Sequence, residues 1–146
     1  MITWNAFVMA VMMVESSGND KAIGDNGASH GPLQIQKDCV DDANRYRRRE
    51  GLPPLRFPQD CYDRRKAELI MIAYLKEYTL PRCKKSHKPA IGIDMNDPKV
   101  REKHYWRTGK RPTIEDYARI WNGGPNGYKI QATVKYWNKV KKELED

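Results

Sequence analysis

The chain has 146 residues and a formal net charge of +8, with 39% hydrophobic and 32% charged residues. This length suits one domain with a single core, and the scattered charges argue against a disordered chain. A basic surface favours anionic partners, such as nucleic acid, acidic lipid or the anionic polymers of a bacterial wall, and charge alone does not choose among them.

The first predicted element is a helix that Thr3 can cap and that runs to about residue 16. Its segment AFVMAVMMV at 6–14 is apolar nearly all round, which predicts a central, buried helix. The segment is too short to span a bilayer. It also lacks the basic start and the cleavage pattern of a signal peptide, so we expect a core helix and no transmembrane segment.

Turn-forming residues dominate positions 18–31, and the segment DNG at 25–27 is a tight-turn signal. We expect a small β-hairpin or an irregular loop there. A second helix is predicted over 37–50, before the linker LPPLRFP. We expect Asp60 to cap a long helix that runs to about residue 79 and is stopped by Pro81.

Residues 82–111 are basic and irregular, with one short helix opened by Asp97-Pro98. Thr113 is expected to cap the next helix in a capping-box arrangement with Asp116. The segment NGGPNG at 122–127 ends that helix. The last predicted helix carries the apolar residues Ile130, Val134, Trp137, Val140 and Leu144. The chain therefore reads as one mainly helical domain with a small β-hairpin or loop region.

The cysteines and histidines indicate neither a complete disulfide framework nor a metal site. Because the cysteines number three, one bridge with a free thiol and three free thiols both remain open. The three histidines are far apart and no Cys-x-x-Cys spacing occurs, so we expect no metal and no cofactor. The residues concerned are Cys39, Cys61, Cys83, His30, His87 and His104.

Glu15 is the most informative position because it closes the most apolar segment of the chain. A carboxyl group at the edge of an apolar helix is partly desolvated, which disfavours its charged form and raises its pKa. A general acid that works near neutral pH needs such a pKa. The alternative is an ordinary solvated glutamate at a helix end.

Two separated segments resemble known peptidoglycan-cleaving enzymes. The pair Glu15-Ser16, followed by a polar loop and by GASHGPLQI at 27–35, resembles the core motif of lysozyme-like enzymes, including soluble lytic transglycosylases. The segments DYARIWNGGPNGYK at 116–129 and ATVKYWNKV at 132–140 are similar to invertebrate-type (i-type, destabilase) lysozymes. This resemblance implies a lysozyme-like α+β fold over 1–146, in which the central helix ends at the catalytic glutamate and 84–111 is an insertion.

The sequence also departs from the i-type pattern. Those lysozymes are rich in disulfides, whereas this chain has three cysteines. Trp121 stands where the family usually has histidine, and Tyr128 where it commonly has cysteine. The fold is therefore expected to depend on its core and helices rather than on covalent links.

The resemblance assigns roles to the two acidic positions. Glu15 would protonate the glycosidic oxygen between N-acetylmuramic acid and N-acetylglucosamine, and Asp25 would be the second carboxylate, which stabilises or attacks the sugar cation. Asp25 is also a common turn residue, and Asp20 is a weaker candidate because it lies too close to Glu15 in the chain. The expected substrate-binding residues are Ser29, Gln34, Trp121, Asn122, Gly123 and Tyr136.

Several of these positions have structural alternatives. Ser29, Gln34 and Asn122 could equally brace loops through hydrogen bonds. Tyr136 is expected to orient Glu15, and Trp121 is either a platform for sugar stacking or a buried anchor.

The leading hypothesis is a muramidase that acts on peptidoglycan, as a monomer, outside the cell, in the periplasm or at the wall. The alternatives are a lytic transglycosylase with Glu15 as its sole acid and base, and a non-catalytic wall-binding domain. Basic segments at 45–50 and 103–111 could bind nucleic acid, and the second interleaves aromatics with cations, as single-strand binders do. We expect no nucleic-acid partner, because a solvated helix face and a cationic insertion attracted to an anionic wall explain these segments.

Overall fold

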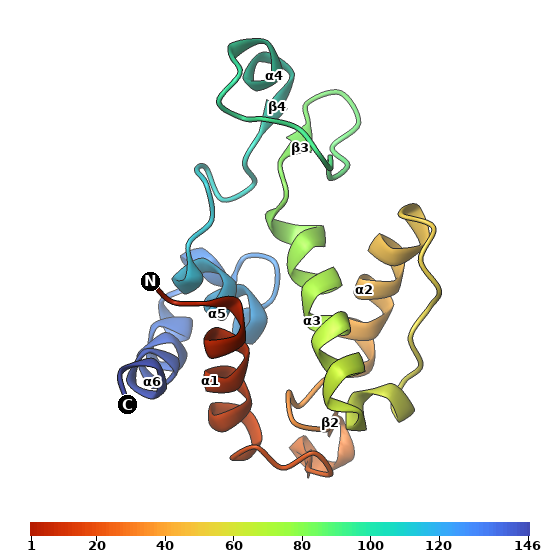
Figure 1. The fold of residues 1–146 in the computed structure, drawn as a ribbon, viewed down its shortest axis with the longest axis vertical. Helices are drawn as coiled ribbons and strands as arrows, with labels where there is room; N and C mark the ends of the chain where they lie inside the picture. Colours follow the sequence, from red (N-terminus) through yellow and green to blue (C-terminus); the bar gives the residue numbers. More distant parts are fainter.

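The computed structural model describes all residues 1–146 and contains six α-helices and two short antiparallel hairpins (Figure 1). The helices are α1 (Trp4–Ser16), α2 (Lys37–Arg49), α3 (Arg64–Thr79), α4 (Pro98–Lys103), α5 (Ile114–Gly123) and α6 (Val134–Glu145). The strands are β1 (Ile23–Gly24), β2 (Ser29–His30), β3 (Arg82–Cys83) and β4 (His104–Tyr105). The mainly helical α+β class predicted from the sequence is confirmed.

The body of the protein consists of two groups of helices around one core. Helices α2 and α3 lie side by side, and α1, α5 and α6 form the other group (Figure 1). Helix α3 joins the groups because it packs against both α2 and α5, while α1 packs against α6. The buried apolar side chains of all five helices merge into a single cluster, so the fold has one hydrophobic core.

Helix α1 is less central than its composition predicts. Phe7 and Val11 are fully buried, but Met9 and Met13 are about half exposed, at 50% and 43% of their surface. The exposed methionines leave one face of α1 in solvent, so the prediction of a helix buried all round is wrong. Helix α3, with eight buried residues, occupies the centre instead.

Most helix boundaries agree with the predicted caps, with two exceptions. Thr3 caps α1, and Thr113 and Asp116 form the expected capping box on α5. Helix α3 is capped by the side chain of Asp63, because Asp60 lies in a preceding 3₁₀ turn and binds the backbone of Arg56. The last helix begins at Val134, and Ile130 lies outside it between two 3₁₀ turns, Gly127–Lys129 and Gln131–Thr133.

The hairpin expected near residues 18–31 is present. Strands β1 and β2 pair Ile23 with His30 and Gly24 with Ser29. The loop between them has positive φ angles at three successive residues, Asp25, Asn26 and Gly27. Asp, Asn and Gly are the residues that tolerate this left-handed conformation best, which explains the DNG sequence.

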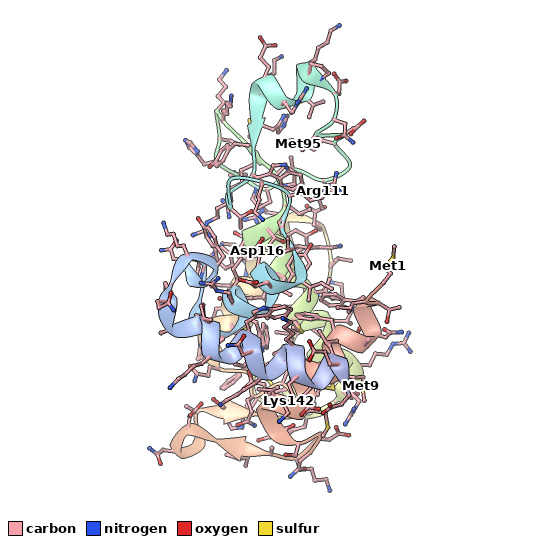
Figure 2. The ribbon with its side chains drawn as sticks, turned by 90° about the vertical axis from the view of Figure 1, so that its left-hand side faces the viewer. Met1, Met9, Met95, Arg111, Asp116 and Lys142 are labelled. Atoms are coloured by element: carbon pink, nitrogen blue, oxygen red, sulfur yellow. The ribbon has the colours of Figure 1, made fainter.

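Residues 82–111, which we call the arm, project from the end of α3 as a separate lobe (Figures 1 and 2). Asp97 caps the predicted short helix, α4. The β3–β4 hairpin, which closes the base of the arm and pairs Arg82 with Tyr105, was not predicted because two-residue strands carry no periodic pattern. Figure 2 shows Met95 in this lobe and Arg111 where the lobe meets the helical body.

All three cysteines are free thiols in this structure. Of the two alternatives that the odd number left open, the structure therefore has three unpaired thiols. No helix is both long enough and apolar enough to cross a membrane.

Candidate active site

The end of α1 and the GPLQ turn are joined directly, so the two halves of the first motif form one structure. The hydroxyl of Ser16 donates a hydrogen bond to the carbonyl of Pro32 at 2.8 Å. Gly31 has φ +80°, and a Cβ at this position would lie 1.8 Å from the carbonyl oxygen of Cys61. Only glycine permits this close backbone approach, which positions the hairpin beside the end of α1.

A cleft of about 440 Å³ lies between this hairpin, α2 and the end of α5. Its lining includes six of the eight residues predicted to be catalytic or substrate-binding, and it is more polar than apolar. The lining residues are Glu15, Asp25, Ser29, Gln34, Ile35, Gln36, Asp38, Cys39, Asp42, Tyr74, Trp121, Asn122, Gly124 and Pro125.

Glu15 enters the cleft from the last turn of α1. The pKa of its carboxyl group is raised from 4.5 to about 7, chiefly by burial and in smaller part by the nearby negative charge of Asp25. The hydrogen bond from the Tyr136 phenol, 2.7 Å to Oε2, opposes this shift, as do Trp121 and Lys139. The balance leaves a carboxyl group that carries a proton below about pH 7.

Asp25 is held on the hairpin loop by two donors. The buried hydroxyl of Ser29 donates to Oδ2 of Asp25 at 2.6 Å, and Nε2 of Gln36 lies 3.5 Å from the same oxygen. Gln36 also donates to Ser29 at 3.1 Å, which closes a small polar network. The Asp25 side chain itself is exposed, so its carboxylate is accessible from the cleft.

Asp20, the weaker candidate for the second carboxylate, is not in the cleft. It pairs with the guanidinium of Arg64 at 2.8 Å on the outer surface.

The remaining predicted residues take different positions. Gln34 lines the cleft, but its amide nitrogen donates to the carbonyls of Ala22 and Gly31 and so braces the hairpin. Tyr136 lies beneath Glu15 and is buried. Gly123 is not among the residues that line the cleft, and a Cβ there would meet the side chain of Thr133 at 2.4 Å, which explains the glycine by close packing.

Trp121 belongs to an aromatic row along the cleft. Its ring meets Tyr74 edge to face, with centroids 5.6 Å apart, and Tyr74 meets Tyr78 in the same manner at 5.2 Å. The indole is half-buried and still forms part of the cleft wall. Trp121 is thus both anchored by its neighbour and open to a ligand, which are the two alternatives that the sequence left unresolved.

Sequence reasoning missed the contribution of α2 to the cleft. The first two turns of this helix add Asp38, Cys39 and Asp42 to the lining, and the segment before it adds Gln36. The i, i+4 spacing of the two aspartates, directly after the GPLQI motif, was the available signal. Asp42 accepts a hydrogen bond from the Tyr78 phenol at 2.7 Å.

The cleft thus combines a largely buried carboxyl group that is protonated below about pH 7 with an exposed carboxyl group on the hairpin loop. Amides, hydroxyls and an aromatic face surround them. A proton donor opposite a second carboxylate is the pairing that most glycosidases use, and amides beside aromatics suit sugar hydroxyls and ring faces.

The comparisons with known proteins agree with this architecture. No family model and no curated protein sequence matches the chain. Among solved structures, the complex of Aeromonas hydrophila PliI with Meretrix lusoria lysozyme matches with 22% identity and a TM-score of 0.64, over 97% of this chain and 89% of that one. The inhibitor-bound lysozyme from Meretrix lusoria matches at a TM-score of 0.63, with the same identity and coverage.

The lysozyme of Tapes japonica matches with 18% identity and a TM-score of 0.62, over 96% of this chain and 89% of that one. The predicted structural resemblance to i-type lysozymes is therefore confirmed over nearly the whole chain.

Proposed function

We propose that this protein, which has the fold of i-type lysozymes, is a muramidase that hydrolyses the β-1,4 bond between N-acetylmuramic acid and N-acetylglucosamine. The observation that carries the proposal is the pair of unlike carboxyl environments in one cleft. Burial raises the pKa of Glu15 to about 7, whereas Asp25 is exposed on the hairpin loop. Environments that separate two carboxyl groups in this way suit an acid and an ionised partner.

In this mechanism, protonated Glu15 donates its proton to the glycosidic oxygen as the bond to the sugar breaks. Asp25 stabilises the positive charge that develops at the sugar carbon, or attacks that carbon to form a glycosyl intermediate. Water then completes the hydrolysis, with Glu15 as the base that accepts its proton. Ser29 and Gln36 orient the Asp25 carboxylate by hydrogen bonding.

Trp121 and Asn122 would bind the glycan on the opposite wall of the cleft. An aromatic face favours stacking of a sugar ring, and an amide offers both a donor and an acceptor to acetamido groups. Tyr136 contacts Glu15 from the interior, and we assign it a positioning role.

One observation favours a second candidate, a lytic transglycosylase. The Asp25 carboxylate already accepts hydrogen bonds from Ser29 and Gln36, which is also what a residue that only braces its loop would do. In a transglycosylase, Glu15 alone would act as acid and then as base, and the 6-hydroxyl of the muramic acid would replace water. A wall-binding domain without catalysis is the alternative of another class.

Digestion of purified peptidoglycan, followed by mass analysis of the muropeptides, tests all three. Reducing muramic acid ends are expected. Anhydromuramic ends, which are lighter by one water, would show that the protein is a transglycosylase and not a muramidase. Protein that sediments with the wall but releases no product would refute both enzymatic proposals.

A further inference from the structure

The positive charge of this protein is concentrated in one lobe. The arm, residues 82–111, contains ten Lys and Arg against three Asp and Glu, a net charge of +7. The remaining 116 residues contain seventeen basic and sixteen acidic side chains, a net charge of +1. The excess charge of the chain therefore belongs to the arm and not to the helical body.

The cations of the arm are not neutralised by the protein. All eight ion pairs in the structure lie in the body, where they involve residues such as Arg45, Arg64 and Arg119. Two of the three acids in the arm are used locally, since Asp94 and Asp97 accept hydrogen bonds from backbone N–H groups. The exposed cations that remain are Lys84, Lys85, Lys88, Lys99, Arg101, Lys103, Lys110 and Arg111.

The other two arginines of the arm join it to the body. Arg82 donates to the carbonyl of Glu77 at the end of α3 and to that of His87 within the arm, both at 2.6 Å. Arg107 donates to the carbonyl of Pro125, which lines the cleft, and to Asn126 at 2.8 Å. Its guanidinium also lies over the ring of Tyr78 at 5.7 Å. Arg107 therefore connects the arm that carries the exposed cations to the wall of the cleft.

The aromatic residues of the arm are engaged within it. The phenol of Tyr105 lies 3.1 Å from Nδ1 of His87, and the two rings meet edge to face. Trp106 is half-buried and is covered by the guanidinium of Arg111 at 5.8 Å. Recognition of single-stranded nucleic acid depends on aromatic faces that are free to stack on bases, whereas Tyr105 and Trp106 are already in contact with His87 and Arg111.

We propose that the arm is a docking surface for the phosphodiester-linked, base-free polyanions of the bacterial wall, such as poly(glycerol phosphate), and that it holds the cleft beside the glycan. The identification of the partner as a wall polymer rests on the proposed muramidase function. The positive charge of the arm is independent of that function. Unpaired Lys and Arg attract a polyanion over several ångströms and release its counterions on binding, so the affinity falls as salt rises.

The test measures binding of soluble poly(glycerol phosphate) to the intact protein, which requires no catalysis. One variant carries Lys84→Gln, Lys85→Gln and Lys88→Gln. The matched control carries Lys135→Gln, Lys141→Gln and Lys142→Gln, three exposed and unpaired cations of α6. Both variants lose three charges, so only the location of the charge differs. All six side chains are exposed, and thermal melting checks that both variants fold.

The arm variant is expected to bind poly(glycerol phosphate) about tenfold more weakly at low salt and to show a shallower salt dependence, while the control changes less than about twofold. Turnover of a short, uncharged chitooligosaccharide should be equal in the two variants. Equal losses of affinity in both variants would overturn the assignment to the arm. Tighter binding of single-stranded DNA than of poly(glycerol phosphate) would overturn the assignment to a wall polymer.

These results are separate from those of the catalytic test. If the protein cleaves no peptidoglycan but polyanion binding is lost only in the arm variant, the muramidase is refuted and the docking surface is retained. If the protein cleaves peptidoglycan but both variants bind the polyanion as well as the wild type, the docking surface is refuted and the muramidase is retained.

Discussion

The phenol of Tyr136 on α6 donates a 2.7 Å hydrogen bond to the carboxyl group of Glu15 at the end of α1, a contact between residues 121 positions apart. Tyr136 is buried, and burial is also the main cause of the raised pKa of Glu15, so the contact lies at the inner side of the cleft. Because α1 packs on α6, the phenol of Tyr136 reaches Glu15 and influences the pKa of the candidate acid.

The activity should therefore fall on the alkaline side of about pH 7, because Glu15 must be protonated to act as the acid and its pKa is about 7. A plot of log kcat/KM against pH is expected to fall about tenfold per pH unit above that value. Activity that stays constant from pH 6 to pH 9 would remove Glu15 from the role of general acid.

Tyr136→Phe should move this alkaline limb to higher pH. The hydrogen bond from the phenol favours the charged carboxylate, so its loss raises the pKa of Glu15. The pH profile of kcat/KM measures the shift. Tyr46→Phe is the control, since Tyr46 is buried but makes no hydrogen bond through its hydroxyl in this structure. An unshifted limb in Tyr136→Phe would show that the contact only supports packing.

Glu15→Gln should abolish catalysis and stabilise the fold at alkaline pH. Because the pKa of Glu15 is raised on folding, its contribution to stability is present below about pH 4.5 and is lost as the pH rises through about 7. The full cost is of the order of 3 kcal/mol. Urea denaturation at pH 8 should show a more stable variant, with a smaller gain at pH 5. A gain that does not depend on pH would contradict the role of ionisation.

Asp25→Asn tests the second carboxylate. Asn also tolerates the φ angle of +49° found at this position, so the loop should keep its conformation while the charge is lost. If Asp25 stabilises the sugar cation, hydrolysis of peptidoglycan should fall by at least about a hundredfold. Asp20→Asn, outside the cleft, should leave the rate unchanged. Full activity in Asp25→Asn would show that Asp25 has no catalytic role and serves only to form the turn.

Gly31→Ala should destabilise the fold far more than Gly27→Ala. Both glycines have positive φ, but a Cβ on Gly31 would overlap the carbonyl oxygen of Cys61, whereas Gly27 faces open space. Urea denaturation should show that the free energy of unfolding falls by more than about 3 kcal/mol in Gly31→Ala and by about 1 kcal/mol in Gly27→Ala. Equal losses would mean that the hairpin can shift away from the Cys61 backbone.

The thiols should react in an order that follows their exposure. Hydrogen bonds from the backbone of Ser86 and Lys85 lower the pKa of Cys83, while burial raises the pKa of Cys61 to about 11. A thiol reagent at neutral pH should modify Cys83 first and Cys61 only on unfolding. Fewer than three thiols in the denatured, unreduced protein would reveal a disulfide instead.

The sequence determined those features that depend on neighbouring residues. Caps such as Thr3 and the Thr113–Asp116 box lie within three residues of the groups they bind. The DNG turn and the short helix after Asp97 also follow from local conformational preferences. The apolar edge at Glu15 predicted a desolvated carboxyl group, and the structure raises its pKa to about 7.

Only the tertiary structure decided which of these residues meet. Gln36, Asp38 and Asp42 share the cleft with Glu15 and Trp121, and the spacing of the two aspartates did not indicate which distant residues they would face. Gly123, which was predicted to bind substrate, packs against Thr133 and is absent from the lining of the cleft. Burial, close approach and the pairing of distant side chains are properties of the assembled core. Local preferences select the elements, and long-range packing decides which side chains share a site.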